Sequence, residues 1–389
     1  MSNTQKKNVP ELRFPGFEGE WEEKRFADFT KINQGLQIAI NERKTEYSPE
    51  LYFYITNEFL RPNSQTKYFI ENPPQSVIAN KEDILMTRTG NTGKVVTNVF
   101  GAFHNNFFKI KFDKNLYDRL FLVEVLNSSK IQNKILSLAG SSTIPDLNHS
   151  DFYSISSSYP LLREQQKIGQ FFSKLDRQIE LEEQKLELLQ QQKKGYMQKI
   201  FSQELRFKDE NGNDYPEWEE KMIKDVYEIT RGLVLSKKLI SKKTNDVNKY
   251  PVYSSQTTNN GLMGYYSDYL YKDSITWTTD GANAGSVSYR SGKFYCTNVC
   301  GVLINEKGNS NLCMSEMLNS IAFKHVSKVG NPKLMNNVMA MVKLNFPCIE
   351  EQLKIARFIE AVEKNIINQE RKIDLLKQVK NGLLQKMFI

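Results

Sequence analysis

The sequence has few of the residues that build metal centres and disulfide frameworks. It contains four cysteines and three histidines in 389 residues. Structural zinc sites need Cys and His ligands at close, repeated spacing. The histidines are scattered singly, and the cysteines occupy the second half without a Cys-x2-Cys pair: Cys296, Cys300, Cys313 and Cys348. We therefore expect no bound metal and four reduced cysteines in or near a core.

Long hydrophobic runs are also missing. No apolar stretch approaches the roughly 20 residues that a membrane-spanning helix needs. Residues 1–10 are polar and lack the apolar centre of a secretory signal peptide. We therefore predict a cytoplasmic protein without a membrane partner. A hydrophobic fraction of 39% and an aromatic fraction of 11% predict a folded chain and not a disordered one.

Catalytic motifs are absent, although two stretches resemble them. Residues 72–75 read Asn-Pro-Pro-Gln, whereas adenine methyltransferases follow Asn-Pro-Pro with an aromatic ring that stacks on a flipped base. Glutamine has no such ring, so we interpret this stretch as a surface turn. Residues 90–94 lack the spacing of an ATP-binding phosphate loop. Acidic residues and histidines do not cluster as two-metal nuclease chemistry requires. The sequence predicts a chain without catalytic machinery.

The chain instead carries a modest excess of positive charge and a long internal repeat. The net charge is +8, which favours a polyanionic partner but also occurs in proteins that bind none. Residues 160–201 match residues 347–388 without a gap, and residues 11–14 return as residues 204–207. A unit of about 190 residues is therefore duplicated, which is far too long for a solenoid repeat and indicates two domains.

The matched segments are predicted to be long helices. Apolar residues recur in them at alternating spacings of four and three, the 3.5-residue period of a coiled-coil seam. The apolar seam positions are Ile168, Phe172, Leu175, Ile179, Leu186 and Leu189 in the first helix, and Ile355, Ile359, Val362, Ile366, Ile373 and Leu376 in the second. Because both helices belong to one chain, each has a partner at high effective concentration, which favours intramolecular pairing over a homodimer.

Polar residues interrupt both seams at the same two places. They are Glu182 and Lys193 in the first helix, and Gln369 and Lys380 in the second. Polar seam positions commonly fix the register of a coiled coil. If the helices pair antiparallel, we expect Glu182 to lie toward Lys380 and Gln369 toward Lys193.

The stretches before each helix are predicted to be mixed α/β domains with short strands. β-branched and aromatic residues predict strands at 76–79, 84–87, 94–97, 107–112, 275–278, 285–289 and 299–304. A short helix is expected near 118–136 and another around 315–328.

The resulting fold class is α+β. Two mixed α/β globular domains are separated by two long helices that pair as an antiparallel coiled coil, with an internal pseudo-two-fold repeat. The expected divisions are 1–158 for the first domain, 159–203 for the central helix, 204–345 for the second domain and 346–389 for the distal helix.

Loops of both domains are rich in the side chains that read base edges and hold phosphates. Taken singly such residues are usually solvated loop positions, but together they form the candidate DNA-binding set. In the first domain the candidates are Arg61, Arg88, Thr89, Asn91, Lys94, Asn105, Asn106, Ser141, Ser142 and Thr143. In the second they are Arg231, Ser254, Ser255, Gln256, Thr279, Asn283, Asn298, Asn331 and Lys333.

With these features laid out, the whole chain resembles the specificity subunit of a type I restriction–modification enzyme. The resemblance rests on the proline-led helix starts at 160–168 and 347–355, found twice at equivalent points. It also rests on Tyr-Pro-Val-Tyr-Ser-Ser at 250–255 with Asn-Gly-Leu-Met-Gly-Tyr at 260–265, and on residues 81–94 in the first half.

The resemblance implies two target recognition domains that each read one half of a split sequence in double-stranded DNA. It also implies docking of two methyltransferase subunits and, through them, motor–nuclease subunits. No cofactor is expected on this chain, since S-adenosylmethionine, ATP and Mg²⁺ would belong to those partners. A helix of about 40 residues is about 60 Å long, which predicts a non-specific gap of several base pairs.

Two other functions remain open from the residues alone. The first is a self-contained DNA methyltransferase or nuclease, which would bind S-adenosylmethionine by itself. The second is a coiled-coil scaffold that does not bind DNA, for which salt-dependent duplex binding would be absent.

Overall fold

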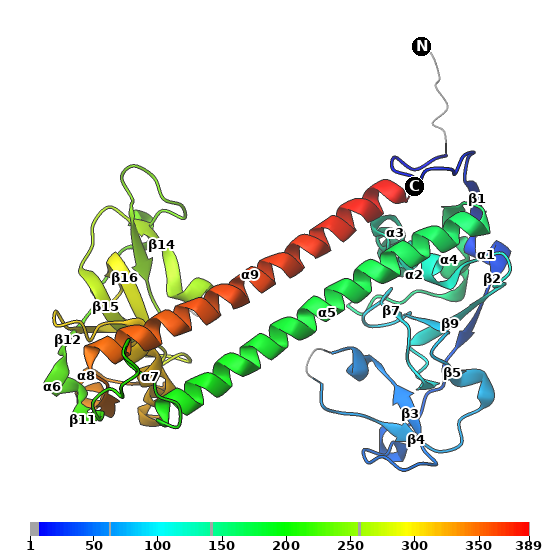
Figure 1. Cartoon of the computed structure of the whole chain (residues 1–389). Coiled ribbons are helices and arrows are strands. Elements are labelled where there is room, and N and C mark those ends of the chain that lie inside the picture. The colour runs from blue at the N-terminus through cyan, green and yellow to red at the C-terminus, as the bar shows by residue number, and fades with distance from the viewer. Residues whose placement is uncertain (1–7, 62–63, 141–142, 256–257, 389) are drawn as a thin grey trace. The chain divides into compact units, whose positions relative to one another are not determined.

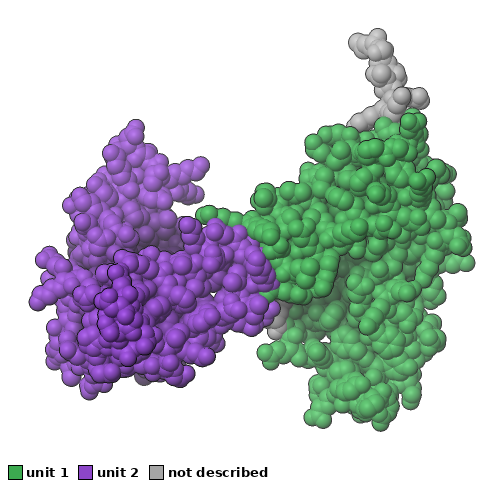
Figure 2. All heavy atoms as spheres, in the orientation of Figure 1, with its two compact units in different colours: residues 1–184, 371–389 green, residues 185–370 purple. Residues whose placement is uncertain are grey.

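The computed structural model describes residues 8–61, 64–140, 143–255 and 258–388. The chain forms two compact units, shown in different colours in Figure 2. Unit 1 comprises residues 1–184 and 371–389, and unit 2 comprises residues 185–370. Each unit contains one globular domain and one half of each long helix. The helices are α5 (Leu162–Phe201) and α9 (Ile349–Met387), and both lie inside the helical segments expected from the sequence (Figure 1).

In unit 1 the two helices run antiparallel and are joined by ion pairs. Lys380 of α9 contacts Asp176 of α5 at 2.6 Å, and Lys372 contacts Glu182 at 2.5 Å. The numbers rise along α5 as they fall along α9, which defines the antiparallel direction. The expected proximity of Glu182 to Lys380 is wrong, because Lys380 contacts the aspartate nearly two turns earlier on α5.

In unit 2 the helix halves also run antiparallel, with the equivalent ion pair. Lys193 of α5 contacts Glu363 of α9 at 2.8 Å, and the Tyr196 and Phe358 rings meet edge-on at 5.5 Å. The expected approach of Lys193 to Gln369 is therefore wrong as well. Lys193 and Lys380 occupy the same position of the repeat, as do Glu363 and Asp176, so the ion pair occurs once in each unit.

On both helices the apolar residues of the 3.5-residue seam are buried or half-buried, whereas leucines off the seam are exposed. Seam residues Ile168, Phe172, Ile179, Ile355, Ile359 and Ile373 are buried. Seam residues Leu175, Leu186, Leu189, Val362, Ile366 and Leu376 are half-buried. Leucines off the seam are largely exposed: Leu181 at 49%, Leu188 at 53% and Leu375 at 60%. Apolar burial therefore follows the heptad and not hydrophobicity alone.

The globular part of unit 1 contains three small sheets. The first is β2 (Thr30–Gln34), β9 (Phe107–Phe112), β6 (Ile84–Thr87) and β7 (Val95–Val96), in that order. The second is β4 (Phe69–Ile70), β3 (Tyr52–Ile55), β8 (Gly101–Phe103) and β5 (Ile78–Ala79). The third pairs β1 (Glu22–Arg25) with β10 (Ser156–Tyr159). The helices are α1 (Phe26–Phe29), α2 (Arg119–Asn127), α3 (Ser129–Ala139) and α4 (His149–Ser154).

The globular part of unit 2 merges the two larger sheets into one of six strands. Their order is β12 (Glu228–Arg231), β17 (Cys300–Ile304), β15 (Tyr271–Thr278), β16 (Val287–Cys296), β13 (Tyr250–Tyr253) and β14 (Leu262–Tyr266). A further pair joins β11 (Glu219–Met222) to β18 (Lys343–Phe346). The helices are α6 (Ile223–Val226), α7 (Leu312–Ala322) and α8 (Asn336–Ala340).

The two units differ in one strand at the place where the sheets merge. Strand β16 corresponds to β7 and β8 of unit 1, which are separated by residues 97–100. Asn98 in that break has a φ of 58°, in the left-handed region that few non-glycine residues adopt. In unit 2 the equivalent residue, Arg290, lies within the continuous strand β16.

Several backbone hydrogen bonds recur at equivalent positions of the two domains, although little sequence is shared. Thr87 accepts from the Gly93 N–H in unit 1, as Thr278 accepts from the Gly285 N–H in unit 2. Gly35 and Gly232 also correspond. A Cβ at either position would overlap the carbonyl oxygen of the neighbouring strand, so only glycine fits. The predicted fold class, with its internal repeat, is confirmed.

Several predicted element boundaries are wrong for local reasons. The helix expected at 118–136 is two helices, because the Ser128 hydroxyl caps α3 by accepting from the Ile131 N–H. The helix expected at 315–328 begins at Leu312, after its cap Asn311, and ends at Ala322. The strands expected at 76–79, 94–97 and 285–289 are trimmed or shifted to 78–79, 95–96 and 287–296.

The repeated Glu-Gln pair at each helix start is buried. Glu164 is 2% exposed and accepts from Nε and Nη2 of Arg13, both at 2.7 Å. Glu351 is 0% exposed and accepts from the same two nitrogens of Arg206 at 3.3 and 2.9 Å. Trp218 Nε1 adds a third donor to Glu351 at 2.9 Å. The repeat therefore preserves one buried carboxylate–arginine pair per unit.

Candidate nucleic-acid interface

Two of the candidate residues in unit 1 mainly hold a loop in place. Arg88 follows β6, and its Nη2 donates to Asp146 at 2.6 Å. Its guanidinium also lies 5.6 Å from the centre of the Phe108 ring, and its side chain is only 18% exposed. The Thr89 hydroxyl donates to the same aspartate. These contacts attach the 145–147 loop to the end of the sheet.

The remaining candidates of unit 1 differ in exposure. Asn91, Lys94 and Thr143 are exposed in loops, and Arg61 is exposed but pairs with Glu58 at 2.7 Å. Asn105 and Asn106 are half-buried beside the end of β8. Ser141 and Ser142 lie outside the described residues.

In unit 2 the positions equivalent to Arg88 and Thr89 are Thr279 and Asp280, and they form a different cluster. Thr279 is fully buried, and Arg231 Nη2 donates to its hydroxyl at 2.9 Å and to Asp280 at 3.2 Å. Asn298 is exposed in the loop after β16, and Asn331 and Lys333 are exposed in the segment between α7 and α8. Gln256 lies outside the described residues.

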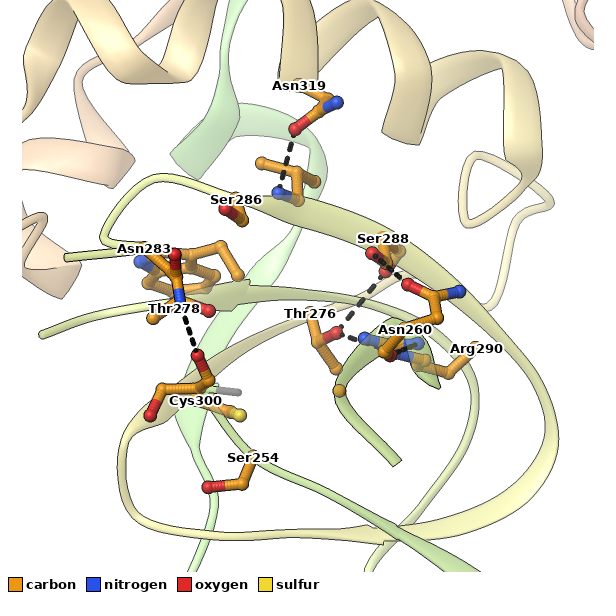
Figure 3. Close-up of a pocket in the computed structure, with 14 residues that line it drawn as sticks. Ser254, Asn260, Thr276, Thr278, Asn283, Ser286, Ser288, Arg290, Cys300 and Asn319 are labelled. Carbon is orange, nitrogen blue, oxygen red and sulfur yellow. Dashed lines mark hydrogen bonds between the residues drawn. The ribbon is translucent and has the colours of Figure 1, made fainter. Parts of the chain in front are cut away.

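A polar pocket in unit 2 brings three of the candidates together, as Figure 3 shows. Ser254, Ser255 and Asn283 line this pocket of about 250 Å³. The Asn283 side-chain amide donates to the Ser255 carbonyl at 2.9 Å, which ties the turn before β16 to the loop after β13. We call it the Arg290 pocket, after the arginine of β16 that also lines it.

The other polar residues of the Arg290 pocket are not among the candidates predicted from the sequence. They are Asn260, Thr276, Thr278, Ser286, Ser288, Arg290 and Asn319. One usable signal was the arginine in the Ser288-Tyr289-Arg290 strand, because a cation seldom occupies an inward strand position without a partner.

A basic loop of unit 2 was missed as well. Residues 237–249 connect β12 to β13 and carry five exposed lysines: Lys237, Lys238, Lys242, Lys243 and Lys249. Within the described part of the chain, none of these lysines forms an ion pair. Such a loop is the electrostatic footprint expected for phosphate contacts.

His104 gives unit 1 a pH-sensitive position beside the candidate residues. Burial, reinforced by the positive charge of Arg43, lowers the pKa of His104 from 6.5 to about 4. Its Nδ1 accepts from the Asn106 N–H at 3.1 Å. Because the folded-state pKa is depressed, stability is complete above pH 6.5 and is lost as the pH falls toward 4. The upper limit of the loss is about 3 kcal/mol at 1.36 kcal/mol per pKa unit, and solvent screening of the half-buried ring reduces it.

We expect His104→Thr, which installs the residue found at the equivalent position 297, to flatten this pH dependence in unit 1. Hydrogen-exchange mass spectrometry in urea at pH 6.5 and 4 follows each unit separately, so unit 2 serves as the reference. His149→Thr, at an exposed position of unit 1, is the control. An equal acid-dependent loss in the His104→Thr variant and the unsubstituted chain would contradict the assignment.

In the parts of the chain that the structure describes, no three or more His, Cys, Asp or Glu residues gather closely enough to bind a metal ion. No described helix has both the length and the apolar character to cross a membrane. Cys296, Cys300 and Cys313 are buried free thiols, and Cys348 is half-buried.

Fold and site together define a duplicated protein with two mixed α/β domains, paired helices and basic, amide-rich loops. The model of the type I restriction modification DNA specificity domain matches residues 18–191 and again residues 215–378. The chain belongs to this family. The prediction of a specificity subunit, and not a catalytic one, is confirmed.

The relatives include specificity subunits of two organisms. The chain is 42% identical over 147 residues to the specificity subunit of the type I restriction enzyme MpnII of Mycoplasma pneumoniae, covering 36% of this chain and 43% of that protein. It is 28% identical over 235 residues to the MjaVIII specificity subunit of Methanocaldococcus jannaschii, covering 58% and 53%. The chain thus spans about half the length of these relatives.

Solved structures share the fold over nearly the whole chain. The S subunit of a type I restriction–modification system from M. genitalium aligns with a TM-score of 0.66 at 16% identity, covering 98% of this chain and 99% of that one. A chain from a study of type I complex assembly and conformational transition aligns with a TM-score of 0.52 at 14% identity, covering 97% and 98%.

Proposed function

We propose that this chain is the DNA-recognition subunit of a type I restriction–modification complex and reads a bipartite target, one half-site per globular domain. The main support is the duplicated hydrogen-bonded framework, which presents different side chains at equivalent places. The side chains of Arg88 and Thr89 donate to Asp146 in unit 1, whereas the side chains of Thr279 and Asp280, at the equivalent positions of unit 2, accept from Arg231. Two domains that share a backbone framework but carry different loop side chains are suited to recognising two different DNA sequences.

The basic loop at 237–249 supports a DNA partner independently of the family. Its lysines would neutralise phosphates and contribute salt-dependent affinity without sequence preference. Exposed loop amides, such as those of Asn298 and Asn331, would then supply the contacts to base edges.

We expect substitutions in one domain to relax one half-site only. Asn331→Ala with Lys333→Ala changes exposed loop residues of unit 2, and Asn91→Ala with Lys94→Ala is the matched pair in unit 1. Each lost base contact should weaken discrimination by about 10- to 100-fold at that half-site. Genome-wide mapping of methylated bases, in cells that carry the chain and its methyltransferase, measures both half-sites. If one pair of substitutions relaxed the sequence preference at both half-sites, the proposal that each domain reads one half-site would be wrong.

The repeated helices would dock the partner subunits. In unit 2 a groove of about 520 Å³ is lined by helix residues Lys194, Met197, Gln198 and Phe201. In unit 1 a groove of about 390 Å³ is lined by the residues at the same repeat positions: Asn381, Leu384, Gln385 and Phe388. Two grooves built from the same helix positions suit two copies of one partner, so we assign one methyltransferase subunit to each.

The cofactors of the complex would be held by these partners. S-adenosylmethionine would bind the methyltransferase subunits, and ATP and Mg²⁺ the motor–nuclease subunits. We expect the isolated chain not to bind S-adenosylmethionine. Stoichiometric binding would contradict the assignment of this cofactor to the methyltransferase subunits.

A further inference from the structure

Arg290 is a buried cation at the wall of the Arg290 pocket. It lies on β16 and is 7% exposed. Its Nε donates to the Thr276 hydroxyl at 3.1 Å, and its Nη1 donates to the Asn260 carbonyl at 2.9 Å (Figure 3). The guanidinium carbon lies 3.9 Å from the centre of the Tyr253 ring. These contacts fix the orientation of the guanidinium.

None of these partners neutralises the charge. In the described residues no Asp or Glu forms an ion pair with Arg290, and no carboxylate is among the residues that line the pocket. Burial lowers the pKa of Arg290, yet a guanidinium stays protonated at neutral pH. A buried charge without a counter-charge is unfavourable. The pocket therefore presents positive charge that only an external anion can balance.

The backbone that supports Arg290 is held in an unusual conformation. Asn259 and Asn260 have φ values of 52° and 51°, in the left-handed region, one directly after the other. Consecutive left-handed residues other than glycine cost free energy and are usually retained for function. Here they direct the Asn260 carbonyl to Nη1, so the strained turn positions the guanidinium.

The other polar groups of the pocket are suited to oxygen ligands. Ser254, Ser286 and Ser288 contribute hydroxyls, and Asn283 and Asn319 contribute amides. A nucleobase would instead need an open aromatic face for stacking. Trp277 is 1% exposed and Tyr253 is covered by Arg290, so neither ring offers one.

We propose that the Arg290 pocket binds a phosphate group, with Arg290 as its charged ligand and the surrounding hydroxyls as further donors. The inference rests on the proposed function, under which the phosphate belongs to the DNA backbone beside the second half-site. A free phosphate ion offers the same chemistry. Among the described residues of unit 1 the equivalent site is not formed, because Asn98 occupies the position equivalent to Arg290 and accepts from Arg119 at 3.2 Å.

The test measures binding of duplex DNA to the full-length chain over a range of salt concentrations. Arg290→Gln should reduce the slope of log K against log salt by about 0.9, the value for one phosphate contact, and leave the half-site sequence unchanged. Asn98→Ala is the matched control in unit 1 and should keep the full slope. Ser288→Asp, at a half-buried position, places a carboxylate by the guanidinium and should reproduce the loss even if Arg290→Gln impairs folding.

Titration of inorganic phosphate, followed by phosphorus NMR, distinguishes the two sources. Binding to the unsubstituted chain and not to the Ser288→Asp chain, with an unchanged DNA salt slope, assigns the pocket to free phosphate. An unchanged slope and no phosphate binding would overturn the proposal, as would an altered half-site with an unchanged slope, which indicates a base contact. If the unsubstituted chain fails to bind DNA, the proposed function is wrong, while the phosphate titration still decides the pocket.

Discussion

Replacing Arg206 by methionine is expected to destabilise unit 2 by about 3–5 kcal/mol, the usual effect of removing one partner of a buried ion pair. Glu351 is 0% exposed and would remain charged in the interior with Trp218 as its remaining side-chain donor. Arg206 also donates to the Pro216 carbonyl at 2.6 Å, so the chain entering the domain loses a support as well. Hydrogen-exchange mass spectrometry in denaturant measures this loss for unit 2 separately.

The repeat supplies the matched variant for this experiment. Arg13→Met removes the same partner from Glu164 and should destabilise unit 1 by a similar amount, leaving unit 2 unaffected. Adding Glu351→Gln to Arg206→Met removes the stranded charge and should restore part of the lost stability. A double variant as unstable as the single one would show that packing of the arginine side chain, and not its charge, accounts for the effect.

Either substitution, Gln198→Arg or Gln385→Arg, is expected to halve the number of methyltransferase subunits that the chain binds, from two copies to one. Both glutamines are exposed on their helices and line the two grooves, and arginine is a good helix former, so the fold should be retained. A bulky cation in the groove would remove its complementarity to the partner. The double variant should bind none.

Native mass spectrometry of the purified complexes reads this stoichiometry directly. Gln191→Arg and Gln378→Arg are matched controls, since they are exposed glutamines of the same helices that do not line either groove. They should keep two copies bound. Equal losses in the controls, or two copies retained in the double groove variant, would place the docking surface elsewhere.

The sequence predicts the helices well and their register poorly. Apolar positions such as Ile168 and Ile355 recur with the heptad, and their burial follows from that period. The register depends on which charged side chains meet. Asp176 and Glu363 lie outside the apolar seam pattern, yet they and not the seam residues Glu182 and Gln369 pair with the two seam lysines. Long flexible lysines reach past the seam, which a pattern of apolar residues does not reveal.

The candidate site shows a similar limit. Composition directed attention to polar loops, and three of the selected residues do meet in one pocket: Ser254, Ser255 and Asn283. Composition did not distinguish Arg88 from Arg290. Arg88 forms an ion pair with Asp146, whereas Arg290 has no carboxylate partner among the described residues. Arg88 directly follows β6, and Arg290 lies within β16. Only the three-dimensional neighbours decide whether a charge is already balanced.

The division of the helices between the units sets the order in which this chain can complete its folding. Unit 2 is continuous in sequence, whereas unit 1 also requires residues 371–388. Met387 is 3% exposed in the core of unit 1, and the Phe388 ring stacks on Phe121 at 5.3 Å. Domains generally fold from the amino terminus as the chain is synthesised, at about 5–20 residues per second. We therefore expect the domain made first to finish last, with its core incomplete until the ribosome has delivered the second globular domain and the end of α9.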